Sequence, residues 1–423
     1  MLKQIEGSQG VAQAVALCRP DVICAYPISP QTHIVEALGV LCRKGALPTS
    51  EYINVESEFA AMSVAIGASA AGARAYTATA SQGLLFMAEA VYNASGLGLP
   101  IVMTVANRAI GAPINIWNDH SDSQSQRDCG WIQLFCEDNQ EAVDLHIQAF
   151  RIAEELSVPV MVCMDGFVLT HAFERMDVPS QEEVDRFLPP FEPRQVLDPA
   201  KPYSIGAMVG PEAFTEVRYL AHLKMLDALD VVEKSSREFE SVFGRKSGGL
   251  VSEYRTEDAE VIVVALGSLV GTIKDAVDEL REEEGLRIGV LSIVCYRPFP
   301  YEAVRKALSK ARTVVVVDRM LSPGCGGVVD LDVMKSLRGL PVEQRSVIAG
   351  LGGRQVTRES FKKSFRAACA GEPVENPEIL DLDRELIAAQ LEREASRRHV
   401  GPVAESLNRH VAQRKIEKGE EIE

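Results

Sequence analysis

The sequence reads Ala25-Tyr26-Pro27-Ile28-Ser29-Pro30-Gln31-Thr32 at the point where a short apolar run gives way to prolines and polar residues. The run that precedes it, Asp21–Tyr26, predicts a buried strand, and Thr32 opens a predicted helix. A strand, a loop and a helix in this order are typical of an open α/β sheet, which binds ligands at the carboxyl ends of its strands. We therefore expect a binding site in the loop between the strand and the helix.

A second stretch, Asn54-Val55-Glu56-Ser57-Glu58-Phe59-Ala60-Ala61, places Glu58 before a nearly unbroken run of small and apolar residues that ends at Ala73. A carboxylate that faces such packing needs a specific partner, because a buried unpaired charge destabilises the fold. The residues alone leave two interpretations of Glu58 open. It is either a helix-start carboxylate beside a Ser57 cap, or a group that shares a proton with a ligand nitrogen.

Strands and helices alternate along two parts of the chain. In the first part we predict strands at Val22–Tyr26, Arg74–Thr79, Pro100–Val105 and Val158–Cys163, and helices at Thr32–Arg43, Glu58–Ala71, Leu84–Ser95 and Asn139–Ser157. In the second part we predict strands at Val261–Leu266, Arg287–Ile293 and Thr313–Asp318, and helices at Ile273–Glu283 and Tyr301–Ser309. Continuously apolar strands indicate sheets covered on both faces. The predicted fold class is α/β, with two doubly wound, mainly parallel-sheet domains.

The region between these two parts contains many prolines in an acidic background, followed by a long stretch with helical spacing. The prolines predict an extended connector, and residues 212–243 predict one helix that bridges domains or packs against a partner. We therefore expect domains at residues 1–195 and 256–370, a connector with a bridging helix at 196–255, and a charged helical tail with a frayed end at 371–423.

The composition argues against several classes of partner and site. Lys and Arg total 44 against 60 Asp and Glu, so the net charge is −16 and neither nucleic acid nor an anionic membrane is expected as a partner. The chain shows neither a signal-peptide pattern nor an apolar run of membrane-spanning length, so we expect a cytoplasmic protein. The nine cysteines form no CxxC pair, so we expect reduced thiols and no metal ligands on this chain.

Residues 106–123 resist the strand and helix pattern and predict a long functional loop over the sheet edge. Arg108 opens this loop and either clamps a substrate carboxylate or forms a surface salt bridge. Ser29 either donates to the same carboxylate or is a turn residue. His120 is an acid, a ligand or a hydrogen-bonded structural histidine. After the strand that ends at Leu266, we expect Ser268 to cap the next helix.

Six motifs, in their order along the chain, carry a resemblance to one family. They are Tyr26-Pro27-Ile28-Ser29-Pro30-Gln31-Thr32, Asn54-Val55-Glu56-Ser57-Glu58-Phe59-Ala60-Ala61, Thr79-Ala80-Ser81-Gln82-Gly83, Ala106-Asn107-Arg108-Ala109, Trp117-Asn118-Asp119-His120 and Asp165-Gly166-Phe167. The chain resembles the alpha subunits of pyruvate:ferredoxin oxidoreductase (pyruvate synthase), of the 2-oxoacid:ferredoxin oxidoreductase family. The similarity continues through Tyr296-Arg297-Pro298-Phe299-Pro300 and Gly350-Leu351-Gly352-Gly353-Arg354.

The resemblance implies a thiamine-diphosphate enzyme that decarboxylates pyruvate, reduces ferredoxin and forms acetyl-CoA, reversibly. It implies a pyrimidine-binding first domain and a transketolase C-terminal-like second domain. Glu58 matches the glutamate that hydrogen-bonds the N1′ nitrogen of the cofactor's aminopyrimidine ring, and Pro27 and Ile28 match cofactor-binding positions. Arg108 and Ser29 match the positions that hold the substrate carboxylate. Glu58 and Arg108 would then be the catalytic residues of this chain.

Other parts of the active site are missing from the sequence, which lacks a Gly-Asp-Gly…Asn stretch and a cysteine cluster. The resemblance therefore implies a beta subunit that brings the diphosphate, Mg2+ and a 4Fe-4S cluster, gamma and delta subunits with CoA-binding and ferredoxin-like parts, and a dimer of heteromers. Ser29 stands where many members have threonine, which enlarges the pocket slightly, and Ser121 where many have glutamine.

Three alternatives follow from these departures and absences. The first is the same chemistry on 2-oxoglutarate or on a branched-chain or aryl 2-oxoacid. The second is a non-catalytic scaffold subunit. The third is a transketolase or an NAD-linked dehydrogenase, which the absence of a diphosphate motif and of a nicotinamide fingerprint disfavours.

Overall fold

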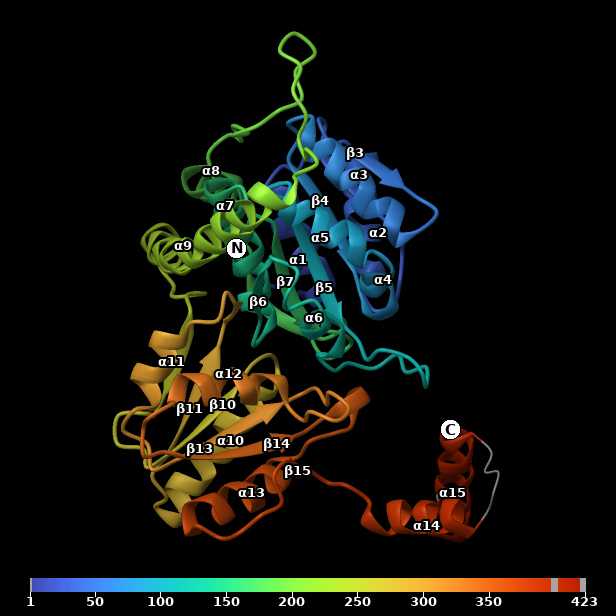
Figure 1. Cartoon of the computed structure of the whole chain (residues 1–423), viewed down its shortest axis with the longest axis vertical. Helices are drawn as coiled ribbons and strands as arrows, with labels where there is room; N and C mark the ends of the chain where they lie inside the picture. Colours follow the sequence, from blue (N-terminus) through green and yellow to red (C-terminus); the bar gives the residue numbers. More distant parts are fainter. Residues whose placement is uncertain (1, 397–401, 419–423) are drawn as a thin grey trace. The chain divides into compact units, whose positions relative to one another are not determined.

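The computed structural model describes residues 2–396 and 402–418. The chain divides into two compact units, residues 1–378 and residues 379–423. The first unit contains two sheets, each flanked by helices, and Figure 1 shows most strands of the first in blue to green and those of the second in yellow to orange. The predicted α/β fold class with two mainly parallel sheets is confirmed.

The first sheet has seven strands in the order β12-β6-β7-β5-β4-β2-β3. They are β2 (Val22–Ala25), β3 (Glu51–Asn54), β4 (Ala75–Thr79), β5 (Val102–Asn107), β6 (Ile132–Phe135), β7 (Val160–Asp165) and β12 (Cys295–Arg297). All neighbours are parallel except β12, which runs antiparallel to β6. The carboxyl ends of β2, β4, β5 and β7 therefore meet at one edge of this sheet.

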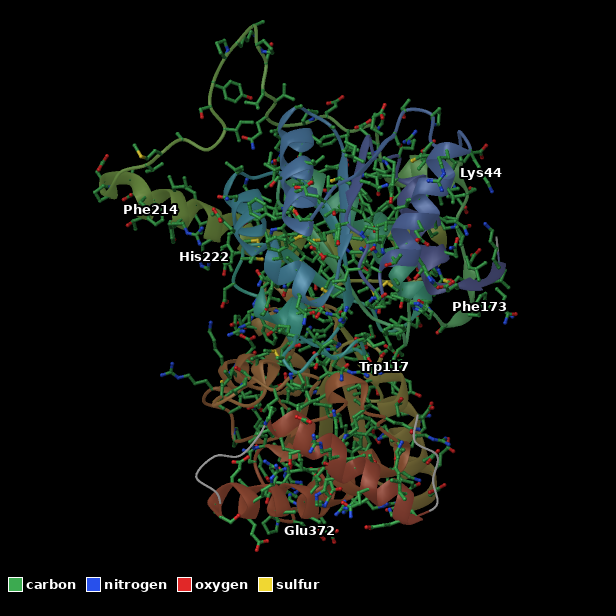
Figure 2. All side chains as sticks on the ribbon, turned by 90° about the vertical axis from the view of Figure 1, so that its right-hand side faces the viewer. Lys44, Trp117, Phe173, Phe214, His222 and Glu372 are labelled. Atoms are coloured by element: carbon green, nitrogen blue, oxygen red, sulfur yellow. The ribbon has the colours of Figure 1, made fainter. Side chains whose placement is uncertain are left out.

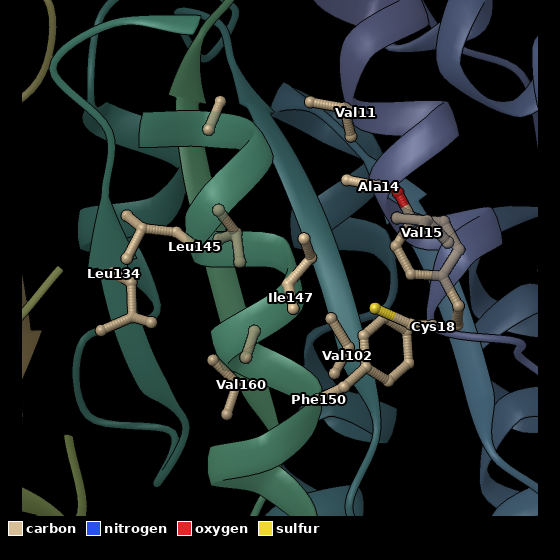
Figure 3. Packing of buried hydrophobic residues seen from close by; sticks show 14 of the residues in the cluster. Val11, Ala14, Val15, Cys18, Val102, Leu134, Leu145, Ile147, Phe150 and Val160 are labelled. Carbon is tan, nitrogen blue, oxygen red and sulfur yellow. The ribbon is translucent and has the colours of Figure 1, made fainter. Parts of the chain in front are cut away.

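Helices cover both faces of the first sheet, as the continuously apolar strands predict. On one face lie α1 (Gly7–Leu17), α2 (Thr32–Arg43), α7 (Asn139–Leu156) and α9 (Pro211–Phe243), and on the other α3 (Glu58–Ala70), α4 (Ser81–Phe86) and α5 (Ala88–Gly96). Along β7, Val160 and Val162 belong to the first core and Met161 and Cys163 to the second. Figure 3 shows the first core, where Phe150 lies against the strand that carries Val102.

The second sheet has six strands in the order β15-β14-β13-β10-β11-β9. They are β9 (Val251–Tyr254), β10 (Val261–Ala265), β11 (Ile288–Ile293), β13 (Thr313–Asp318), β14 (Glu343–Ile348) and β15 (Glu378–Ile379). Its helices are α10 (Leu269–Glu284), α11 (Tyr301–Leu308), α12 (Val328–Leu337) and α13 (Arg358–Ala370). The strands β14, β13, β10 and β11 are parallel, and β9 is antiparallel to β11.

The remaining elements connect or extend these layers. A two-stranded antiparallel sheet joins β1 (Leu2–Glu6) to β8 (Phe173–Asp177), and the short helices are α6 (Ser121–Ser125) and α8 (Gln181–Phe187). The tail forms a pair of helices, α14 (Arg384–Ser396) and α15 (Val403–Lys418), as predicted. The predicted frayed end includes residues 419–423, which lie outside the described residues.

Most predicted elements agree with the structure to within a few residues, but the predicted helix Leu84–Ser95 is wrong. Two helices, α4 and α5, stand in its place and are separated at Met87, whose φ of −91° and ψ of 6° leave the helical range. The first of them begins at Ser81, whose backbone N–H donates to the buried Asp122 carboxylate (2.9 Å). Because this contact joins residues 41 positions apart, the local sequence does not reveal it.

The long predicted helix at 212–243 is confirmed as α9, which starts at Pro211 and ends before Gly244 in the left-handed region (φ 70°). Its second half packs on α7 and α8 of the first domain. Figure 2 shows Phe214 on its other half, which projects from that domain. The nine cysteines are all free thiols, and no helix among the described residues is long and apolar enough to cross a membrane.

Candidate active site

The predicted site segments lie where neighbouring parallel strands end. The loop with Ser29 follows β2, the segment that leads to Gly83 follows β4, and Arg108 follows β5. Asp165 is the last residue of β7. Since β2, β4, β5 and β7 are consecutive in the sheet, the topology collects these residues at one edge, the usual ligand position of such sheets.

Glu58 is the first residue of α3, and its carboxylate is buried, with only 7% of the residue exposed. Ser57 caps the helix, because its Oγ accepts from the backbone N–H of Ala60 (3.2 Å). The predicted Ser57 cap is confirmed. Glu58 is the acidic residue of the first turn, as the helix-start interpretation predicts, and within residues 2–396 and 402–418 no group donates a hydrogen bond to its side chain.

The Glu58 carboxylate lies directly over Gly83 of α4. A Cβ atom at Gly83 would approach Glu58 Oε1 and Thr79 Oγ1 to 2.7 Å each, closer than real Cβ contacts. The Thr79 hydroxyl is also buried and has no hydrogen-bond partner among the described residues. A buried polar atom without a partner is costly, so the Thr79 hydroxyl beside the Glu58 carboxylate favours a polar ligand at this edge.

Arg108 is half-buried and points toward the loop that carries Ser29. Its Nη1 donates to the Ser29 backbone oxygen (3.0 Å) and its Nε to the Asn115 backbone oxygen (3.0 Å). Burial lowers the pKa of its guanidinium, and the nearby Asp122 opposes this shift. Both side-chain hydrogen bonds of Arg108 go to backbone oxygens and none to a carboxylate of a described residue, so the surface salt-bridge interpretation is wrong. Its Nη2 donates no hydrogen bond within the described part of the chain.

The loop residues differ in exposure. Ser29 and Pro27 are exposed, and Ile28 is half-buried. The loop is held at its end by Gln31, whose Nε2 donates to the Tyr26 backbone oxygen (2.9 Å). The structure thus brings Arg108 and Ser29 together, whereas no direct contact joins either residue to Glu58.

Asp122 connects the segment that follows β4 with the segment that follows β5. Its Oδ2 accepts from the backbone N–H groups of Ser81 and Arg108 (2.9 Å each), and its Oδ1 accepts from Asn107 Nδ2 (2.8 Å). Complete burial raises the pKa of this carboxyl to about 6, although the hydrogen bonds oppose the shift. The sequence interpretation did not assign this role to Asp122. The feature that could have indicated it is an acidic residue in a long loop directly after a strand.

A second buried carboxylate, Asp165, has a full set of partners. His120 Nε2 donates to its Oδ1 (2.7 Å), and its Oδ2 accepts from Arg319 Nη1 (3.0 Å) and from the Ser268 N–H and hydroxyl (2.8 and 2.5 Å). Burial raises the pKa of Asp165, but the interactions with His120 and with the Arg319 guanidinium outweigh this and hold it well below its usual range. His120 is therefore the hydrogen-bonded structural histidine.

The prediction that Ser268 caps its helix is wrong. Its side chain makes no capping hydrogen bond to α10, because the hydroxyl is used by Asp165, which lies 103 residues earlier in the chain. This contact ties the second sheet's domain to the first.

The long loop at 106–123 is held against the second domain by a glycine-rich turn. The Gly353 N–H donates to the Asn118 backbone oxygen (2.8 Å), and Asn115 Nδ2 donates to the Gly352 backbone oxygen (3.1 Å). Gly353 has a φ of 78°, and a Cβ there would lie 2.3 Å from the Trp117 Cβ. Figure 2 shows Trp117 at the level where the two domains meet.

Comparison with known proteins adds the following findings. A family model described as "Pyruvate flavodoxin/ferredoxin oxidoreductase, thiamine diP-bdg" matches residues 13–237, and one described as "Pyruvate:ferredoxin oxidoreductase core domain II" matches residues 259–361. The chain is 48% identical over 392 residues to the pyruvate synthase subunit PorA of Methanosarcina barkeri, which covers 90% of this chain and 97% of that protein. It is 39% identical over 363 residues to the ketoisovalerate oxidoreductase subunit VorA of Pyrococcus abyssi, covering 85% of this chain and 91% of that one.

Among solved structures, the fold is similar to that of the 2-oxoglutarate:ferredoxin oxidoreductase from Magnetococcus marinus. The TM-score is 0.67 at 18% sequence identity, covering 87% of this chain and 65% of that chain. The family models together cover most strands of both sheets of the first unit, and the sequence similarity extends over nearly the whole of the curated relatives. The chain belongs to the pyruvate flavodoxin/ferredoxin oxidoreductase family.

Proposed function

We propose that this chain is the alpha subunit of a thiamine-diphosphate-dependent enzyme that oxidatively decarboxylates pyruvate, with CoA and ferredoxin, to acetyl-CoA and CO2, reversibly. The single observation that carries the proposal is the buried Glu58 carboxylate, which has no partner among the described residues at the ligand edge of the first sheet. The similarity to pyruvate synthase subunits over nine-tenths of the chain supports the choice of substrate.

The residues at this edge fit the aminopyrimidine end of thiamine diphosphate. Glu58 and Thr79 bring two oxygen atoms to within contact of Gly83, where a side chain would displace the carboxylate, and the Thr79 hydroxyl has no hydrogen-bond partner among the described residues. When bound, thiamine diphosphate supplies a carbon nucleophile for the oxo group of the substrate. The Glu58 carboxylate would share a proton with the N1′ nitrogen of the ring, and Pro27 and Ile28 would line the cofactor from the loop after β2.

Arg108 and Ser29 form the second half of the proposed site. Arg108 keeps its Nη2 group free of hydrogen bonds to described residues, so it can bind the carboxylate of a 2-oxoacid while its other nitrogens hold the loop. The exposed Ser29 hydroxyl adds a second donor. Asp122 acts as a positioning residue, since its carboxylate accepts a hydrogen bond from the backbone N–H of Arg108 and so fixes the backbone there.

The rest of the active site comes from partner subunits in this proposal. A beta subunit brings the diphosphate-binding motif, Mg2+ and a 4Fe-4S cluster, gamma and delta subunits bring CoA-binding and ferredoxin-like parts, and the complex is a dimer of heteromers that reduces ferredoxin. The absence of a diphosphate motif and of a cysteine cluster in the sequence supports this division of labour. The cytoplasmic location and the domain limits at residues 195, 255 and 370 remain predictions.

A branched-chain 2-oxoacid is the second candidate substrate. The resemblance to a ketoisovalerate oxidoreductase subunit and the small Ser29 side chain favour it, but the identity is lower, at 39% against 48%. The test is ferredoxin reduction by the co-purified complex with pyruvate, 2-oxoglutarate and 2-oxoisovalerate at equal concentrations. We expect pyruvate to give the highest kcat/KM. A clear preference for another acid would reject the substrate, and no reduction with any acid would favour a scaffold.

A further inference from the structure

Three side chains from distant parts of the chain meet on the side of the first domain near α2. Glu6 ends β1, His33 lies in the first turn of α2, and His171 follows β7 in a turn. Each offers one ligand atom, and the three atoms lie within 4.8 Å of one another. His33 Nδ1 donates to Glu6 Oε1 (2.6 Å), and the rings of His33 and His171 are 4.6 Å apart at their centroids.

The histidines present nitrogen atoms suited to a metal ion. Thr170 Oγ1 is hydrogen-bonded to His171 Nδ1 (2.7 Å) and also accepts from the Phe167 N–H (2.8 Å). The hydrogen bond to Thr170 fixes the ring of His171 and leaves Nε2 as its free nitrogen. Metal-binding histidines are commonly oriented by such a hydrogen bond to their other ring nitrogen.

We propose that Glu6, His33 and His171 bind one Zn2+ ion, with water as the fourth ligand. Two imidazoles and one carboxylate with an open position are a common zinc set, whereas Mg2+ and Ca2+ prefer oxygen ligands. In a tetrahedral zinc site neighbouring ligand atoms lie about 3.3 Å apart. The present spacing, between 2.6 Å and 4.8 Å, therefore needs only side-chain rotation.

Solvent reaches the proposed site. The His33 side chain is 44% exposed and that of Glu6 15%. Both line a cavity of about 670 Å3, whose charged lining also includes Glu36 and Lys44. An ion can therefore enter from this cavity, which also has room for the fourth ligand.

A bound ion would brace the loop that carries Ser29. His33 lies four residues after Ser29, and a Cβ at Gly166 would lie 2.4 Å from Pro30 Cγ, so the turn before His171 packs tightly on this loop. The Phe167 ring packs in a tilted arrangement against His171, at 4.7 Å between ring centroids, and against Trp117, at 4.9 Å. The ion would join β1, α2 and this turn, which the chain connects only through long intervening segments.

The test is zinc binding to the metal-free full chain, measured by calorimetry and by metal content after dialysis. We expect one zinc ion per chain, and a loss of affinity of about a hundred-fold or more in Glu6→Gln, His33→Gln and His171→Ala. Glu6→Gln keeps the shape of its side chain, so it separates ligation from folding. His222→Ala removes an exposed histidine on α9 and is the matched control, which should bind zinc normally.

Cobalt substitution distinguishes this site from the thiols, of which Cys325 is exposed. We expect a spectrum of nitrogen and oxygen ligation without a thiolate-to-cobalt charge-transfer band, and no competition by Mg2+. Zinc binding that is unchanged in the three variants, a thiolate band, or no stoichiometric zinc in the unmodified chain would each overturn the proposal.

Discussion

Glu58 and Asp165 are two buried carboxylates near the same sheet edge, and their surroundings are opposite. Asp165 accepts from His120, Arg319 and Ser268, which use both of its oxygen atoms. Glu58 accepts no hydrogen bond from any described residue, although it is nearly as buried. The difference indicates that Asp165 holds the two domains together, and it supports the proposal that Glu58 pairs with the cofactor.

The largest expected effect on stability comes from removing the charge of Asp165. We expect Asp165→Asn to lower the free energy of unfolding by about 3–5 kcal/mol, because His120 and Arg319 lose their buried counter-charge. Denaturant unfolding of the full chain measures this loss. The matched control is Asp185→Asn, whose ion pair with Arg19 is exposed (40% and 42%) and which we expect to change stability by less than about 0.5 kcal/mol. Equal effects of the two substitutions would contradict a structural role for Asp165.

Arg108→Lys is expected to have the next largest effect, on activity. Lysine keeps the charge but cannot hold the Ser29 loop and a substrate carboxylate at once, so we expect kcat/KM for the 2-oxoacid to fall about a hundred-fold. Steady-state ferredoxin reduction by the complex measures it. A loss in kcat/KM below three-fold would remove Arg108 from the proposed substrate site.

Gly83→Ala tests the space beside Glu58. A methyl group there meets Glu58 Oε1 and Thr79 Oγ1, so we expect the carboxylate to move and turnover to fall about ten-fold. Stability should change by less than about 1 kcal/mol, since alanine favours the helix. Gly67→Ala in α3 is the matched control, because a Cβ there meets no atom within 4 Å. A fall in stability without a fall in turnover would show that Gly83 serves packing alone.

A further effect concerns pH. The pKa of Asp122 is raised from 3.8 to about 6 in the folded protein, so the folded state binds the extra proton more tightly than the unfolded state. Its contribution to stability is therefore favourable below pH 3.8 and is lost as the pH rises toward about 6. In plots of the unfolding free energy against pH, Asp122→Asn should remove this loss of stability between these pH values. A slope unchanged in Asp122→Asn would show that other groups cause it.

Protonation of Asp122 should lower activity, although it favours stability. Protonation of Asp122 weakens its hold on the N–H groups of Ser81 and Arg108, so we expect kcat/KM to fall as the pH drops below about 6. The dependence of kcat/KM on pH, measured with the complex, tests this expectation.

The sequence was sufficient for elements that depend on local patterns. The helix at Thr32–Arg43 and the strand at Thr313–Asp318 have the predicted bounds, because apolar periodicity and terminal residues define them locally. The Ser57 cap is likewise predicted by the local sequence, because serine is a preferred residue at the start of a helix.

The errors arise where residues far apart in the chain decide the structure. The strand β12 joins the first sheet from the second region, and Ser268 serves Asp165 instead of its own helix. The expectation of no metal ligands rests on cysteine spacing and stays a prediction, and the proposed ligands Glu6, His33 and His171 come from three elements without a spacing motif. Long-range contacts of this kind have no signature in a single sequence.

The difference between the two carboxylates is tested most directly by Glu58→Gln in the assembled complex, with turnover and unfolding measured on the same preparation. Glutamine keeps the shape of the side chain but cannot hold the proton for N1′, so we predict a loss of turnover of about a thousand-fold with unchanged assembly and stability. Turnover above about a tenth of the unmodified level, or a loss that merely follows a fall in stability, would contradict the assigned role of Glu58.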